Sequence, residues 1–124
     1  MKVLYVEDDS LLRELYNLKL SKAGYLVDTA VNGEDGLAKA KSFLPDLILL
    51  DILMPKLDGL GMLKLLRQDP ATQHIPVILL TNSPSLPNAR ECEALGITNV
   101  FLKANVTPAQ LVSYLQTFFS KQSS

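Results

Sequence analysis

Five polar side chains in this sequence could together handle a phosphoryl group. Glu7 and Asp8 follow an apolar run near the N-terminus, Asp51 ends a second run, and Thr81 and Lys103 end two later ones. A carboxylate can attack phosphorus and form an acyl phosphate. Mg²⁺ prefers one or two carboxylates together with water and phosphate oxygens. A hydroxyl and an ammonium group would stabilise charge on the phosphoryl oxygens.

The elements that would position these residues alternate along the chain. The apolar patterns predict strands at 3–6, 25–31, 46–50, 76–81 and 98–103. The helices are expected from Ser10 to about Ala23, from the cap Asn32 to Pro45, from the cap Asp58 to Pro70, from Pro87 or Asn88 to Gly96, and from Thr107 onward. This alternation predicts an α/β fold with a five-stranded parallel sheet between five helices, whose leucine stripes face the core.

All strands of such a sheet end at one edge, where open α/β sheets bind their ligands. The three carboxylates would meet there and repel, since two unit charges 4 Å apart cost about 4 kcal/mol at an effective dielectric of about 20. A divalent cation would offset this repulsion, and Lys103 supplies a second positive charge. Asp9 is better explained as a helix cap, His74 as a loop residue and Cys92 as a small core residue.

Composition narrows the function classes. The chain has 124 residues, 48% of them hydrophobic, which suits one globular domain. Its 12 basic and 13 acidic residues leave a net charge of −1, which argues against direct binding to nucleic acid. One cysteine, no signal-peptide pattern and no apolar run of about 18 residues lead us to expect a cytoplasmic protein with no membrane association.

On these residues the sequence resembles the receiver domain of two-component response regulators, over essentially its whole length. The resemblance rests on Glu7-Asp8, Asp51, the turn Met54-Pro55-x-Leu57-Asp58-Gly59, Thr81 and Lys103. It implies a flavodoxin-like, doubly wound sheet in the order 2-1-3-4-5. It also implies one receiver domain over residues 1–124, similar to single-domain chemotaxis regulators, without an output domain.

The same resemblance implies the chemistry. Asp51 would accept a phosphoryl group from a sensor histidine kinase or a histidine phosphotransfer protein, assisted by Thr81 and Lys103. Mg²⁺ would be held by Asp8, Asp51 and the backbone carbonyl of Leu53, with Glu7 acting partly through water. The domain would catalyse only its own phosphotransfer and dephosphorylation. It would signal by protein contact through the face formed by helix 87–96, strand 98–103 and the helix from Thr107.

Other classes fit the sequence less well. A flavodoxin-type electron carrier needs a phosphate loop after the first strand, where this chain has acid. A phosphatase of the haloacid dehalogenase type places its nucleophile after the first strand and carries a cap insertion. The remaining alternative is a pseudo-receiver, a scaffold that binds partners independently of phosphorylation.

Three positions depart from the family pattern. Ala104 stands where most receivers have a proline in a cis peptide, so we expect a trans bond after Lys103. Val100 replaces an aromatic residue that moves on activation, and Phe101 should point to the opposite face of its strand. Asn82 replaces a small residue. We therefore expect signalling without a rotating aromatic ring, and a long-lived aspartyl phosphate, since Leu53 is apolar and Asn82 adds bulk.

Overall fold

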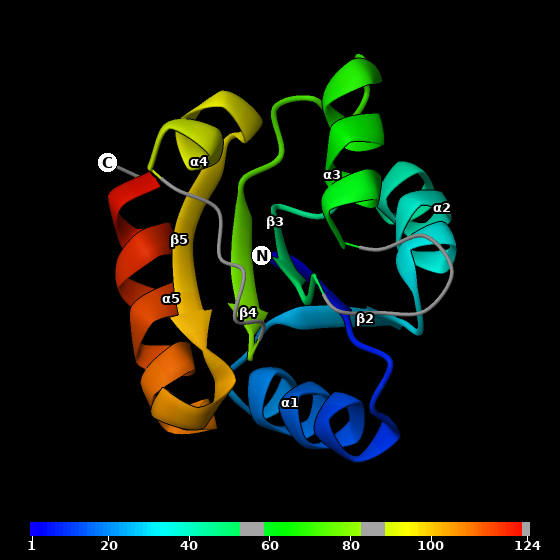
Figure 1. Ribbon diagram of the computed structural model, residues 1–124. Coiled ribbons are helices and arrows are strands. Elements are labelled where there is room, and N and C mark those ends of the chain that lie inside the picture. Colours follow the sequence, from blue (N-terminus) through cyan, green and yellow to red (C-terminus); the bar gives the residue numbers. More distant parts are fainter. Residues whose placement is uncertain (53–58, 83–88, 123–124) are drawn as a thin grey trace.

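The computed structural model describes residues 1–52, 59–82 and 89–122. Strands and helices alternate along it as predicted (Figure 1). The elements are β1 (Lys2–Val6), α1 (Ser10–Lys22), β2 (Leu26–Ala30), α2 (Gly33–Phe43), β3 (Leu47–Leu50), α3 (Gly59–Gln68), β4 (Val77–Thr81), α4 (Ala89–Leu95), β5 (Ile97–Leu102), the 3-10 helix η1 (Lys103–Asn105) and α5 (Pro108–Gln122). All strand pairs are parallel, in the order β2-β1-β3-β4-β5, which confirms the predicted fold.

Side-chain caps begin the helices where the sequence predicted them. Asp9 caps α1 by accepting from the backbone N–H groups of Leu11 and Leu12. Asn32 caps α2 by accepting from the N–H of Asp35. Thr107 and Gln110 form a reciprocal capping box before α5, with N–H···O distances of 2.9 and 3.1 Å. The predicted cap of α3, Asp58, and the predicted start of α4 lie outside the described residues.

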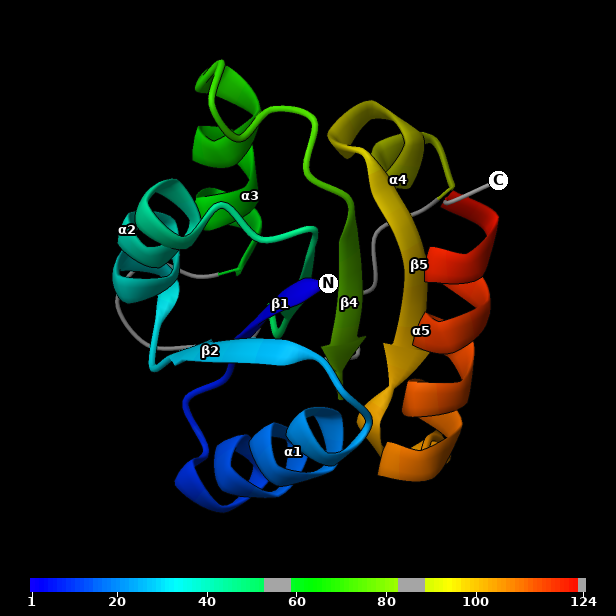
Figure 2. The same ribbon diagram turned by 180° about the vertical axis from the view of Figure 1, so that it is seen from behind.

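Helices lie on both faces of the sheet (Figure 2), and each face has its own layer of core side chains. Helices α2, α3 and α4 cover one face, and α1 and α5 cover the other. Every residue of β3 and β4 is buried, as expected for strands covered on both sides. Val100 packs on the α2–α3–α4 side and Phe101 on the α1–α5 side, as predicted, and Cys92 packs partly buried in the same cluster as Val100.

Two expectations were wrong. The leucine stripe of α1 is not all core, because the helix rests on the sheet through Tyr16 and Leu20 and leaves Leu11, Leu15 and Leu18 exposed. The last strand ends one residue earlier than predicted. Lys103 therefore begins η1 instead of ending β5, because the chain turns there toward α5.

Two further observations concern single features. His74 is exposed in the turn before β4, as predicted for a loop residue. Among the residues that the structure describes, no helix is both long enough and apolar enough to cross a membrane.

Candidate phosphoryl-accepting site

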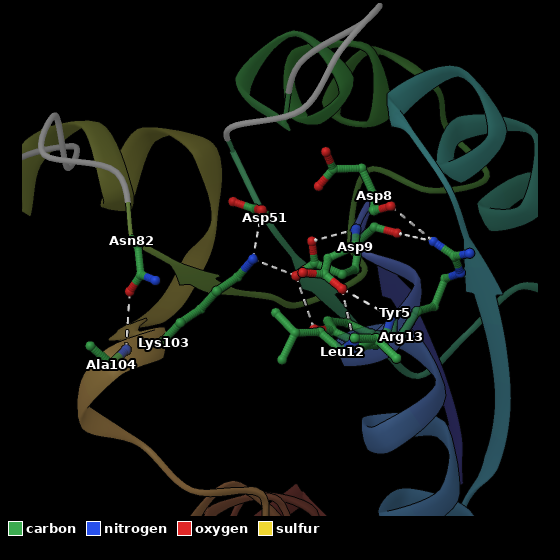
Figure 3. Close-up of polar contacts among 11 residues, drawn as sticks. Tyr5, Asp8, Asp9, Leu12, Arg13, Asp51, Asn82, Lys103 and Ala104 are labelled. Atoms are coloured by element: carbon green, nitrogen blue, oxygen red, sulfur yellow. Dashed lines mark hydrogen bonds and ion pairs between the residues drawn. The ribbon is translucent and has the colours of Figure 1, made fainter.

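Strand alternation brings three of the predicted site residues to one face of one sheet edge. Tyr5, Leu49 and Phe101 all pack on the α1–α5 side of the sheet. The residues two positions further along are Glu7, Asp51 and Lys103, and Lys103 contacts both carboxylates. The side chains of Asp51 and Lys103 meet beyond the ends of β3 and β5 (Figure 3), and Glu7 pairs with Lys103 from the end of β1.

Glu7 is the most enclosed carboxylate of the site, with no exposed surface. Its Oε1 accepts from the hydroxyl of Tyr5 at 3.1 Å and pairs with the ammonium of Lys103, and its Oε2 accepts from the N–H of Asp9 at 3.1 Å. Burial raises the pKa of Glu7, and the hydrogen bonds from Lys103 and Asp9 oppose this rise. Both oxygens of Glu7 therefore already accept from protein donors, and its contact with a cation through water stays a prediction.

Lys103 links the two buried carboxylates. Its Nζ lies 2.8 Å from Oδ2 of Asp51, which is itself 3% exposed, and also pairs with Oε1 of Glu7 (Figure 3). Burial acts to lower the pKa of Lys103, but its bonds to Asp51 and Glu7 outweigh burial and the pKa is raised. The ammonium therefore stays charged and holds together two groups that would otherwise repel.

Asp8 is exposed and completes an acidic cluster. One oxygen from each of Glu7, Asp8 and Asp51 lies within 4.8 Å of the others, close enough to surround one ion. Arg13 braces this loop from α1, since its Nη1 donates to the carbonyls of Glu7 (2.8 Å) and Asp8 (3.3 Å). An all-oxygen donor set with one exposed carboxylate fits Mg²⁺, which keeps several waters. Leu53, the predicted carbonyl ligand, lies outside the described residues.

Thr81 ends β4 at the same sheet edge and is fully buried. It pairs in register with Leu102, the residue before Lys103. The next residue, Asn82, accepts a hydrogen bond at Oδ1 from the N–H of Ala104, at 3.0 Å (Figure 3). No described peptide bond is cis, so the bond between Lys103 and Ala104 is trans, as predicted.

Sequence reasoning missed two residues that shape the site, Tyr5 and Arg13, and identified a third, Gly59, only as part of a turn. Tyr5 supplies a buried hydroxyl to Glu7, and the sequence signal was a tyrosine two positions before the acid on the same strand. Arg13 lies at the end of the first turn of α1, six residues after Glu7. Gly59 packs so closely on the end of β3 that a Cβ atom there would lie 2.4 Å from the carbonyl oxygen of Asp51.

Comparisons with known proteins agree with this geometry. The family model described as response regulator receiver domain matches residues 3–116. The chemotaxis protein CheY4 of Vibrio cholerae superposes with a TM-score of 0.83 at 34% identity, over 94% of this chain and 96% of that one. A CheY-like receiver domain protein of Methanospirillum hungatei superposes with a TM-score of 0.87 at 25% identity, over 98% and 95%.

Curated relatives match over 80 residues, or 64% of this chain. The DNA-binding dual master transcriptional regulator RpaA of Synechocystis is 42% identical, and the response regulator PleD of Caulobacter vibrioides is 44% identical. The matched part covers 33% of RpaA and 18% of PleD, so this chain aligns with a third or less of either relative.

Proposed function

Because the chain belongs to the response regulator receiver domain family, we propose that it takes a phosphoryl group onto Asp51 and signals through protein contacts. Receiver domains are signalling modules of two-component systems, and phosphorylation on aspartate is general for the family. The observation that carries the proposal for this chain is the contact of Asp51 with Lys103, beside Glu7 and Asp8.

The phosphodonor is a phosphohistidine of a sensor kinase or of a phosphotransfer protein. One carboxylate oxygen of Asp51 attacks phosphorus, the P–O bond forms as the P–N bond breaks, and the histidine nitrogen leaves. Lys103 is 2.8 Å from Asp51, so its ammonium can follow the charge from the carboxylate to the phosphoryl oxygens. Thr81, at the end of the neighbouring strand, donates its hydroxyl to a phosphoryl oxygen.

Asp8 and Asp51 would hold Mg²⁺ directly, and Glu7 would act through water because Tyr5, Asp9 and Lys103 already bind its oxygens. When bound, the ion supplies charge neutralisation for the phosphoryl oxygens. The carbonyl of Leu53 is the further ligand that the family resemblance implies. The chain's only catalysis is then its own phosphorylation and dephosphorylation.

The donor would dock on α1. This helix begins two residues after Asp8 and exposes Leu11, Leu15 and Leu18, with exposed fractions of 77%, 40% and 51%. The spacing of four and three residues places the three leucines on one side of the helix. A helical donor covering this stripe would bring its phosphohistidine to the neighbouring sheet edge. The downstream target would bind the face formed by α4, β5 and α5.

The test of this function is phosphoryl uptake by the purified chain. With Mg²⁺ and acetyl phosphate, the mass should rise by one phosphoryl group, and Asp51→Asn should abolish the rise. Asp8→Asn should also abolish the uptake. In the wild type, Mg²⁺ at ten times its dissociation constant should raise the free energy of unfolding by about 1.4 kcal/mol, and Asp8→Asn should remove this increase. No uptake and no beryllofluoride binding by a folded wild-type chain would favour the phosphorylation-independent scaffold.

The docking surface has a separate test. Leu15→Glu should slow phosphorylation by a phosphohistidine protein while leaving the rate with acetyl phosphate unchanged, since the small donor needs no docking surface. Leu44→Glu is the matched control, because Leu44 is exposed to a similar degree (51%) after α2. Equal effects of Leu15→Glu on both donors would contradict docking on α1.

A further inference from the structure

One side chain joins the two loops that follow Thr81 and Lys103. Asn82 directly follows Thr81, Ala104 directly follows Lys103, and Asn82 Oδ1 accepts from the N–H of Ala104 at 3.0 Å (Figure 3). The last backbone pair between β4 and β5 is Thr81 with Leu102. The Asn82 side chain therefore extends the pairing of these two strands beyond their ends.

This hydrogen bond joins two residues that depart from the family pattern, Asn82 and Ala104. The donor exists because residue 104 is alanine, since a proline there would have no N–H. The acceptor exists because residue 82 is asparagine, since a glycine or alanine side chain has no oxygen. The hydrogen bond thus needs both departures from the family pattern at once.

The contact also bears on where the ammonium of Lys103 lies. Lys103 is the first residue of η1, and no side-chain hydrogen bond caps η1 at Leu102. Its Nζ must reach both Asp51 and Glu7 from this short turn. The bond from Ala104 to Asn82, one residue beyond Lys103, joins that turn to the end of β4.

We propose that Asn82 is a positioning residue for the reaction at Asp51: its amide oxygen holds the Lys103–Ala104 turn against the end of β4 so that the ammonium stays on the acceptor carboxylate. This role rests on the proposed phosphoryl transfer to Asp51. Asn82 acts through Lys103 and need not touch the phosphoryl group itself. It replaces with a side-chain bond the rigidity that a proline would give this turn.

The hydrogen bond is tested without any phosphodonor, by exchange of the Ala104 amide proton measured by NMR. Asn82→Leu keeps the side-chain size and removes the acceptor, so exchange should become about threefold to tenfold faster. Asn82→Asp keeps an acceptor oxygen at the same position and should retain slow exchange. Unchanged exchange in the leucine variant would overturn the proposal.

The effect on the reaction is tested with acetyl phosphate at fixed Mg²⁺. Asn82→Leu should slow phosphorylation of Asp51 by about threefold to tenfold. Asn105→Leu, the same change at an exposed residue that ends η1, should leave the rate unchanged. In an Ala104→Pro background, which lacks the donor, Asn82→Leu should have no further effect on the rate. Equal slowing by Asn82→Leu with and without the donor would overturn the proposal.

The two readouts separate this inference from the function on which it rests. A wild-type chain that takes up no phosphoryl group would overturn the proposed function and the rate effect together, while exchange at Ala104 would still report the hydrogen bond. Slower phosphorylation with unchanged exchange would show that Asn82 acts by another route, and would overturn the positioning role. Urea unfolding of each variant confirms that the proteins compared are folded.

Discussion

Replacing Gly59 with alanine should disturb both the stability of the fold and the position of Asp51. Gly59 is the first residue of α3, and its N–H donates to the carbonyl of Ile52 at 3.3 Å. A Cβ atom at this position would lie 2.4 Å from the carbonyl oxygen of Asp51 and 2.5 Å from Cα of Ile52. Both atoms belong to backbone and cannot rotate away.

The size of the effect follows from these distances. Ordinary Cβ contacts begin at 3.4 Å, so α3 and the end of β3 would have to separate by about 1 Å. Overpacking of this kind costs about 1–3 kcal/mol. We expect the upper end, because β3 is fully buried between β1 and β4. For a chain of this size, about 3 kcal/mol lowers the unfolding midpoint by roughly 10 °C.

The same displacement should slow the reaction. The carboxylate of Asp51 is 2.8 Å from the ammonium of Lys103, and moving one of them by about 1 Å breaks the hydrogen bond. A misplacement of about 1 Å can cost roughly 100-fold in rate. We therefore expect Gly59→Ala to reduce the rate of phosphorylation by acetyl phosphate to about a hundredth of the wild-type value.

Gly36→Ala is the matched control. A Cβ there would meet the Sδ and Cε atoms at the end of the Met62 side chain, 2.9 Å away, and Cγ2 of Val6 at 3.0 Å. All three are side-chain atoms, and the Met62 chain can change rotamer. Alanine is also better than glycine inside a helix by roughly 1 kcal/mol, so the net change should stay within about 1 kcal/mol. Urea unfolding gives both values. A Gly59→Ala protein as stable as the Gly36→Ala protein would refute the reasoning.

Three further predictions concern stability. The half-buried guanidinium of Arg67 donates to four backbone carbonyls, at distances between 2.7 Å (Leu95) and 3.3 Å (Gly96). Arg67→Met should therefore lower the free energy of unfolding, measured in urea, by about 2 kcal/mol, and Arg67→Lys by nearly as much. A lysine variant as stable as the wild type would contradict this. Thr107→Ala should cost about 1 kcal/mol by removing the cap of α5, whereas Thr107→Ser should keep it. Because folding raises the pKa of Lys103, its stabilisation is complete below the unfolded lysine pKa of about 10.4 and is lost as pH rises through the folded pKa. The difference in unfolding free energy between wild type and Lys103→Met, measured in EDTA, should therefore shrink as the pH rises above about 10.4. A difference that stays constant over this range would refute the ion-pair explanation.

Much of this protein was determined by short-range patterns in the sequence. The alternation of apolar runs and amphipathic stretches indicated the parallel sheet, because strands buried on both faces, such as β3 and β4, read as continuous apolar runs. Asp9, Asn32 and Thr107 marked the helix starts, because a cap bonds to N–H groups two or three residues away.

The same local rules placed most of the site. Parallel strands end at the same edge of their sheet, so residues that follow their carboxyl ends come together there. Glu7, Asp51 and Lys103 each directly follow a strand and meet there for that reason, although they are 44 and 52 residues apart in sequence. The meeting of these three side chains could therefore be predicted from residue types and spacing, as could the trans bond after Lys103, whereas their role toward a phosphoryl group stays a prediction.

Only the tertiary structure decided which further residues contact the group formed by Glu7, Asp51 and Lys103 and its neighbouring loops. The hydroxyl of Tyr5 on Glu7, the approach of Gly59 to Asp51 and the bond from Ala104 to Asn82 depend on distances between elements, which no period encodes. The same holds for the leucines of α1. Their helical spacing is that of a core face, yet three stay exposed, because the way α1 rests on the sheet through Tyr16 and Leu20 decides which side of the helix is covered.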